Sequence, residues 1–157
     1  VDYIEANGLR VLNPQTLLKS IFCPEGTLTR KKPSLALLQD MDFGLRIARQ
    51  MADSEIGQAV VVKNQAIVAV EGMEGTDRLI RRGGRLAGPG FVVVKAGRSA
   101  QDMRIDLPAV GLDTVRAVIQ AGASALGLEA SGVAFFQKKE AIELADRHAL
   151  AIVVRRL

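Results

Sequence analysis

The stretch AVVVKNQAIVAV, residues 59–70, decides the fold class of this chain. It holds two apolar runs rich in β-branched residues, 59–62 and 66–70, with three polar residues between them. Such runs favour strands, and the short polar break predicts a β-hairpin. Further strand-like runs occupy residues 91–94, 125–128, 133–136 and 151–154. Helical patterns separate most of these strands, so we expect an α/β fold: one domain with a mixed, mostly parallel sheet flanked by helices and carrying one hairpin.

The longest helical pattern begins at Ser34, a residue type that caps helix N-termini. Its apolar positions recur three and four residues apart, at Leu38, Met41, Leu45, Ala48 and Ala52. Shorter helices are predicted at residues 77–82 with a stop at Gly83 and Gly84, from a cap at Asp113 to a stop at Gly122, and at residues 138–148. Before them we expect a strand at residues 9–12 and a helix at residues 14–22.

Composition limits the class of protein. The chain has 157 residues, 48% of them apolar, which suits one packed domain. A single cysteine, Cys23, excludes a disulfide within the chain and a cysteine-based zinc site. The sequence shows neither a signal-peptide pattern nor an apolar run that could span a bilayer, so we expect a cytoplasmic protein. Cys23 and the one histidine, His148, have no catalytic partner nearby in sequence, and we expect structural roles for both.

The charge balance indicates an anionic partner. Lys and Arg number 21 against 17 Asp and Glu, a net charge of +4, which suits a ligand that carries phosphate. Tryptophan is absent and aromatic residues make up only 4%, so the stacking surfaces used by single-stranded nucleic acid binders are not expected. We therefore expect no nucleic acid partner.

Two carboxylate-rich loops follow predicted strands, where α/β sheets bind ligands. The first, EGMEGTD at residues 71–77, offers a metal and phosphate site. The alternative is that Thr76 is the N-cap of a helix, Asp77 is a favourable acid in its first turn, and Glu71 and Glu74 are solvated loop charges. The second loop runs from residue 95 to residue 108. If residues 102–106 are extended, Asp102, Arg104 and Asp106 share one face, as in a Mg²⁺ site; the alternative is a surface ion cluster worth at most ~1 kcal/mol per pair.

A third cluster consists of four arginines: Arg78, Arg81, Arg82 and Arg85. On a short helix, Arg78, Arg81 and Arg82 share one side and could clamp a diphosphate or contact an acidic lipid surface. The alternative is that they complement the C-terminus of a helix and keep its face hydrated.

Six strings in order carry a family resemblance: PEGTLT (24–29), IGQAVVVK (56–63), VEGMEGTD (70–77), RGG (82–84), VVK (93–95) and QDMRIDLP (101–108) with VG (110–111). They resemble the C-terminal domain of the LpxI-type UDP-2,3-diacylglucosamine pyrophosphatases. The resemblance implies that residues 1–157 are the C-terminal catalytic-type domain of a longer two-domain protein, whose N-terminal domain is absent here. Residues 1–13 are then expected to be a linker.

The resemblance also implies an activity. Members hydrolyse the diphosphate of UDP-2,3-diacylglucosamine to UMP and 2,3-diacylglucosamine 1-phosphate (lipid X), in the lipid A biosynthesis of Gram-negative bacteria. They use Mg²⁺ or another divalent cation. The implied partners are this nucleotide-linked lipid, the N-terminal domain and the periphery of the inner membrane, with self-association left open. We expect the chain alone to be weakly active or inactive.

The expected site residues fall into three groups. Asp102 is the catalytic candidate, and the metal candidates are Asp102, Glu71, Asp77 and Asp106. The substrate-binding candidates are Glu25, Gly26, Thr29, Gly75, Thr76, Arg82, Gly83, Gly84, Lys95, Gln101 and Arg104. The rival hypothesis is a non-catalytic module that binds nucleotide sugars or lipids through the same loops.

Overall fold

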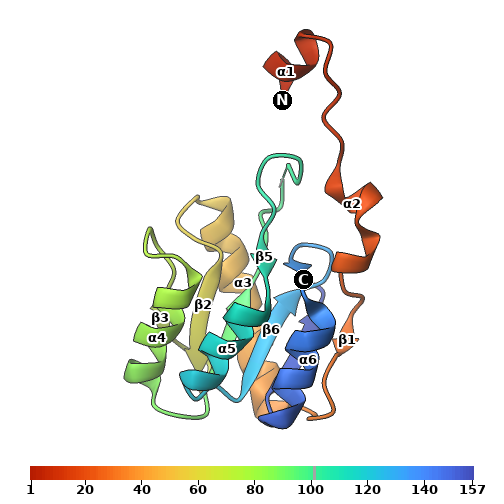
Figure 1. Ribbon diagram of the computed structural model, residues 1–157. Coiled ribbons are helices and arrows are strands. Elements are labelled where there is room, and N and C mark those ends of the chain that lie inside the picture. Colours follow the sequence, from red (N-terminus) through yellow and green to blue (C-terminus); the bar gives the residue numbers. More distant parts are fainter. Residues whose placement is uncertain (101) are drawn as a thin grey trace.

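The computed structural model describes residues 1–100 and 102–157. A six-stranded sheet in the order β1-β8-β6-β4-β2-β3 forms its centre (Figure 1). Its strands are β1 (Gly26–Thr27), β2 (Ala59–Lys63), β3 (Ala66–Val70), β4 (Val92–Lys95), β6 (Ala125–Glu129) and β8 (Ala151–Arg155). A second sheet pairs β5 (Ala109–Val110) with β7 (Ala134–Phe135). The helices are α1 (Asp2–Ala6), α2 (Pro14–Leu17), α3 (Leu35–Asp53), α4 (Thr76–Ala87), α5 (Leu112–Gln120) and α6 (Lys138–Arg147), with a 3₁₀ turn at Lys19–Ile21.

The sheet is mixed, as predicted. Its central strands β4, β6 and β8 run parallel, while β2 and β3 form the antiparallel hairpin and β1 pairs antiparallel with β8. Because β2 is antiparallel to β4, Ala59 at its start lies opposite Lys95 at the end of β4, and Val70 at the end of β3 lies opposite Val60. One edge of the sheet therefore gathers the loops before β2, after β3 and after β4, which we call the carboxyl edge.

Helices cover both faces of the sheet (Figure 1). On one face, α3 packs Met41, Leu45 and Ala48 against valines of β2 and β4. On the other, α4, α5 and α6 enclose a second apolar cluster that includes Leu79 and Phe91. α1 and the segment that follows it extend away from the sheet (Figure 1). No helix in the described part of the chain combines the length and apolar character that crossing a bilayer requires.

The hairpin turn is held from α3. Asn64 and Gln65 both adopt the left-handed conformation, with φ of 53° and 57°, as a tight hairpin turn requires. The buried Asp40 carboxylate accepts hydrogen bonds from their backbone N–H groups at 3.0 and 2.6 Å. The long helix therefore fixes the register of the β2–β3 pair.

The prediction of a helix ending at Gly83 and Gly84 is wrong. α4 continues through both glycines to Ala87, and its C-cap is Gly88. Both glycines are buried, and neither position has room for a side chain: a Cβ at Gly83 would lie 2.5 Å from Val61, and one at Gly84 would lie 2.9 Å from Ala121. They let α4 approach the sheet and the end of α5 closely, so tertiary packing overrides their weak helix propensity.

Three smaller expectations near the termini of elements also change. Residues 9–12 form no strand, and the helix predicted at residues 14–22 breaks at Leu18 into α2 and the 3₁₀ turn. Helix α5 begins after Gly111, so Asp113 lies in its first turn rather than at its cap.

Candidate functional site

A pocket opens at the carboxyl edge, with a volume of about 260 Å³. We call it the edge pocket; its lining residues are Ala52, Glu55, Ile56, Gly57, Gln58, Glu71, Gly72, Arg98 and Asp106. They come from the end of α3, the segment before β2 and the loops after β3 and β4. The pocket therefore brings together parts of both carboxylate loops that the sequence singles out.

Glu71 is the most constrained carboxylate in this pocket. Only 8% of it is exposed, and its two oxygens accept hydrogen bonds from the Gln58 backbone N–H at 3.0 Å and the Thr76 hydroxyl at 2.6 Å. A Cβ at Gly57 would lie 2.3 Å from the Glu71 carbonyl oxygen. Glycine at residue 57 is therefore what allows the two backbones to approach.

Lys95 completes a chain of polar contacts behind the pocket. It is 8% exposed, and its Nζ donates a hydrogen bond to the Thr76 hydroxyl at 2.9 Å. Burial lowers the pKa of Lys95, while the nearby Glu71, Asp77 and Asp106 act in the opposite direction. The Thr76 hydroxyl thus accepts a hydrogen bond from Lys95 and donates its one proton to Glu71, which links the two charged side chains.

The expectation that residues 102–106 are extended is wrong. The backbone N–H groups of Ile105 and Asp106 both bond to the Asp102 carbonyl, which makes this segment a turn. The Asp102 carboxylate accepts from the backbone N–H of Arg104 two residues on, a contact that competes with extended structure.

This turn keeps Asp102 and Arg104 together and places Asp106 apart from them. The Arg104 guanidinium makes two hydrogen bonds to Asp102, at 3.0 and 2.9 Å, and holds the pKa of that carboxyl below its usual value. Arg104 also pairs with Glu5 of α1 at 3.5 Å. Asp106 instead faces the edge pocket, where its carboxylate accepts a 3.4 Å hydrogen bond from the Gln58 side chain. Asp106 therefore lines the edge pocket, whereas Asp102, the catalytic candidate, is not among its lining residues.

The four carboxylates proposed as metal ligands do not form one cluster. Among the described residues, no three Asp, Glu, His or Cys side chains lie together as a metal cage. Two carboxylates, Glu71 and Asp106, do line the edge pocket. Since Mg²⁺ is commonly bound by one or two carboxylates together with water and substrate phosphates, the pair fits an ion that enters with a phosphate ligand.

Several other candidates from the sequence have local partners. Arg82 donates to the Val70 carbonyl at 2.9 Å and to both oxygens of Glu74, the contact that raises the pKa of Arg82. Gly75 caps α4 with a φ of 82°, a conformation that suits glycine. The two α4 glycines lie in the packing contacts described above, outside the edge pocket.

The candidates near β1 lie apart from the edge pocket, because β6 and β8 separate β1 from β4. Gly26 pairs with Val154, and the Thr29 hydroxyl accepts from the Ile152 backbone N–H at 2.9 Å. Glu25 is exposed beside this strand. Gln101 lies outside the described residues.

Two charged residues absent from the sequence-based set hold the loop after β4. The buried Glu129, at the end of β6, accepts the Gly97 backbone N–H at 2.8 Å and pairs with Arg49 of α3. Arg49 also donates to the Ser99 hydroxyl at 3.2 Å. The sequence signal that could have identified Glu129 is its position as a charged residue directly after the apolar run of a buried strand.

Two comparisons relate this chain to known proteins. The family model described as the LpxI C-terminal domain matches residues 24–153. The chain is also similar to the UDP-2,3-diacylglucosamine pyrophosphatase LpxI of Caulobacter vibrioides, at 29% identity over 161 residues. That alignment covers 98% of this chain and 58% of the relative, so the chain spans somewhat more than half of the relative's length.

Proposed function

This chain belongs to the LpxI family, and on that premise we propose that it carries the catalytic groups of a UDP-2,3-diacylglucosamine pyrophosphatase. The proposed reaction hydrolyses the diphosphate to UMP and 2,3-diacylglucosamine 1-phosphate, a step of lipid A biosynthesis. The observation that carries the proposal is the edge pocket, where Glu71 and Asp106 face the same cavity and Lys95 lies behind them.

Hydrolysis of a diphosphate needs cations for the non-bridging oxygens and carboxylates that position a metal or a water molecule. Arg98 lines the edge pocket and pairs with the exposed Glu55 at 3.0 Å, a surface contact that a phosphate can displace. The Lys95 ammonium adds positive charge behind the edge pocket. It also helps to position Glu71, because it donates to the Thr76 hydroxyl, which in turn donates to the Glu71 carboxylate. A bound Mg²⁺ would neutralise charge on the diphosphate and polarise the phosphoryl group under attack.

Asp102 remains our proposed catalytic carboxylate, on the family resemblance of the QDMRIDLP string. Its two hydrogen bonds to Arg104 are at an exposed site, where side chains exchange partners readily. Arg104 is suited to a phosphate as well as to a carboxylate. We propose that a phosphate group of the substrate binds the Arg104 guanidinium in place of the Asp102 carboxylate. The Asp102 carboxylate is then free to act in the hydrolysis.

Further proposals rest on the same resemblance. We propose that the reaction takes place in the cytoplasm, at the periphery of the inner membrane. We also propose that the lipid lies between this domain and a second domain of the whole protein.

The experiment measures UMP release from UDP-2,3-diacylglucosamine, with Mg²⁺ and with EDTA. It uses the 157-residue chain and a chimera in which this chain replaces the matching segment of the Caulobacter relative. We expect Mg²⁺-dependent release from the chimera and a loss of about 100-fold or more in Asp102→Asn. The matched control Asp113→Asn, on the surface of α5, should stay within about twofold of the parent.

Two results would count against the proposal. Binding of UMP without any turnover in the folded chimera would favour the non-catalytic binding module. Equal activity of Asp102→Asn and the parent would remove Asp102 from the catalytic role.

A further inference from the structure

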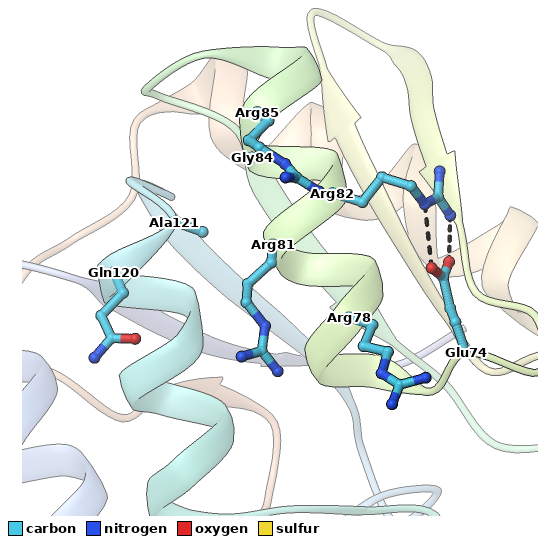
Figure 2. Close-up of a pocket in the computed structure, with 8 residues that line it drawn as sticks. All are labelled: Glu74, Arg78, Arg81, Arg82, Gly84, Arg85, Gln120 and Ala121. Atoms are coloured by element: carbon cyan, nitrogen blue, oxygen red, sulfur yellow. Dashed lines mark hydrogen bonds and ion pairs between the residues drawn. The ribbon is translucent and has the colours of Figure 1, made fainter.

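A row of arginines lies on the outer face of α4. Arg78, Arg81 and Arg85 are spaced three and four residues apart and are exposed. They line a groove of about 690 Å³ whose opposite wall is Gln120 and Ala121 at the end of α5. In Figure 2, Arg81 extends into the gap between the two helices on the side of Gln120.

None of these three arginines forms an ion pair with a described residue, and Arg81 donates a hydrogen bond to the Asp77 backbone carbonyl at 3.2 Å. One carboxylate, Glu74, also lines the groove; its pKa is lowered by the hydrogen bond from Arg82 and, to a smaller extent, by the charge of Arg78. The prediction that Arg82 shares one side of the helix with Arg78 and Arg81 is wrong, because Arg82 turns the other way and pairs with Glu74 (Figure 2). The groove therefore holds four arginines against one carboxylate, and that carboxylate is already paired with Arg82.

Helix stability explains this row only in part. Arg85 lies in the last turn of α4, where the helix dipole favours positive charge, and Asp77 lies four residues before Arg81, a favourable spacing. Arg78, however, lies in the first turn, where the dipole disfavours positive charge, and like charges three and four residues apart destabilise a helix. The arginines are not required as donors to the last carbonyl groups of α5 either. The carbonyls of Ala117, Val118 and Ile119 already accept hydrogen bonds from the backbone N–H groups of residues 121–123, at 3.0 to 3.2 Å. A ligand that supplies negative charge accounts for the row directly.

We propose that this groove is a second anion site, which binds a ligand carrying phosphate groups. Guanidinium groups bind phosphate oxygens in paired hydrogen bonds, and the Gln120 amide can donate a further one. The site is separate from the edge pocket, since the two share no lining residue. Arg85 lies nine residues beyond Thr76, about 13 Å along the helix axis. The proposed hydrolysis does not require this site.

The first experiment is calorimetric titration of the 157-residue chain with inorganic pyrophosphate in EDTA. The test variant is Arg78→Gln/Arg81→Gln/Arg85→Gln. The matched control Lys31→Gln/Lys32→Gln/Arg46→Gln removes the same charge from α3 and the loop before it, away from the groove. We expect the test variant to lose at least about tenfold in affinity and the control to stay within about threefold. Circular dichroism should show that both remain folded.

A second experiment identifies the source of the phosphate. The same proteins are sedimented with vesicles of phosphatidylcholine, with and without phosphatidylglycerol. Sedimentation that needs phosphatidylglycerol and fails in the test variant assigns the groove to lipid headgroups; pyrophosphate binding without sedimentation assigns it to a free phosphate compound.

Three results would overturn the proposal. The first is an equal loss in the test variant and the control, which would mean nonspecific charge attraction. The second is binding of neither probe. The third is pyrophosphate binding that persists in the test variant but disappears in Lys95→Met, which would place the anion at the edge pocket.

Discussion

Replacement of Thr76 by valine tests the polar chain behind the edge pocket. Valine has nearly the shape of threonine but lacks the hydroxyl that joins Lys95 to Glu71 at 2.9 and 2.6 Å. Both charged partners are 8% exposed, so water replaces the lost contacts poorly. The substitution therefore leaves two buried charges each short of one hydrogen bond.

The size of the effect follows from these two contacts. A hydrogen bond to a charged group contributes about 1.5 to 3 kcal/mol. Thr76 itself is only half-buried, so we take the lower value for each contact and expect a loss of about 3 kcal/mol in the free energy of unfolding. That corresponds to about a 100-fold change in the folding equilibrium.

Urea unfolding followed by circular dichroism measures this loss. Thr76→Ser keeps the hydroxyl and should lose less than about 1 kcal/mol. Thr114→Val makes the same chemical change in the first turn of α5. The Thr114 side chain forms no hydrogen bond within the described part of the chain, so this variant should stay within about 0.5 kcal/mol of the parent. A Thr76→Val protein as stable as Thr114→Val would refute the proposed contribution of this polar chain.

Three further predictions concern nearby structure. Gly57→Ala should destabilise the chain by about 1 to 3 kcal/mol, because its Cβ would lie 2.3 Å from the Glu71 carbonyl oxygen. Gly72→Ala is the control, because the space around Gly72 is open. Equal urea midpoints for the two variants would contradict the packing argument. Asp40→Ala should cost about 1 to 2 kcal/mol by removing the acceptor for two N–H groups of the β2–β3 turn, and an unchanged unfolding free energy would disprove that role. Burial lowers the pKa of Lys95 below its ordinary 10.5, so as the pH rises the folded chain loses this proton before the unfolded chain does. The free energy of unfolding, relative to that of Lys95→Met, should therefore rise with pH between the lowered pKa and 10.5. A difference between the two proteins that stays constant across that window would contradict the lowered pKa.

The sheet could be predicted because the sequence patterns that identify its strands and helices are local. The β-branched runs of β2, β3 and β4 identify strands wherever they lie in the fold, and the apolar spacing of α3 together with Ser34 identifies a capped helix. The hairpin and the alternation of helices and strands then give the mixed sheet and place two loops at its carboxyl edge.

The wrong predictions arise where contacts with distant residues or side-chain hydrogen bonds determine the backbone conformation. Glycine after a short helical pattern usually ends a helix, and nothing local to Gly83 reveals that Val61 requires a residue without a side chain at that position. At Asp102 the carboxylate bonds to the backbone two residues on and forms a turn instead of an extended segment. Glu129 meets the loop after β4 because β6 pairs with β4, a relation that only the topology supplies.

The most direct test of the proposed reaction compares two glutamates. In the chimera with the Caulobacter relative, Glu71→Gln removes the charge of the buried edge-pocket carboxylate, and Glu143→Gln makes the same change on the surface of α6. We predict that Glu71→Gln lowers the rate of UMP release by about 100-fold or more while the protein remains folded, and that Glu143→Gln stays within about twofold of the parent. Equal rates for the two folded variants would contradict the assignment of hydrolysis to the edge pocket.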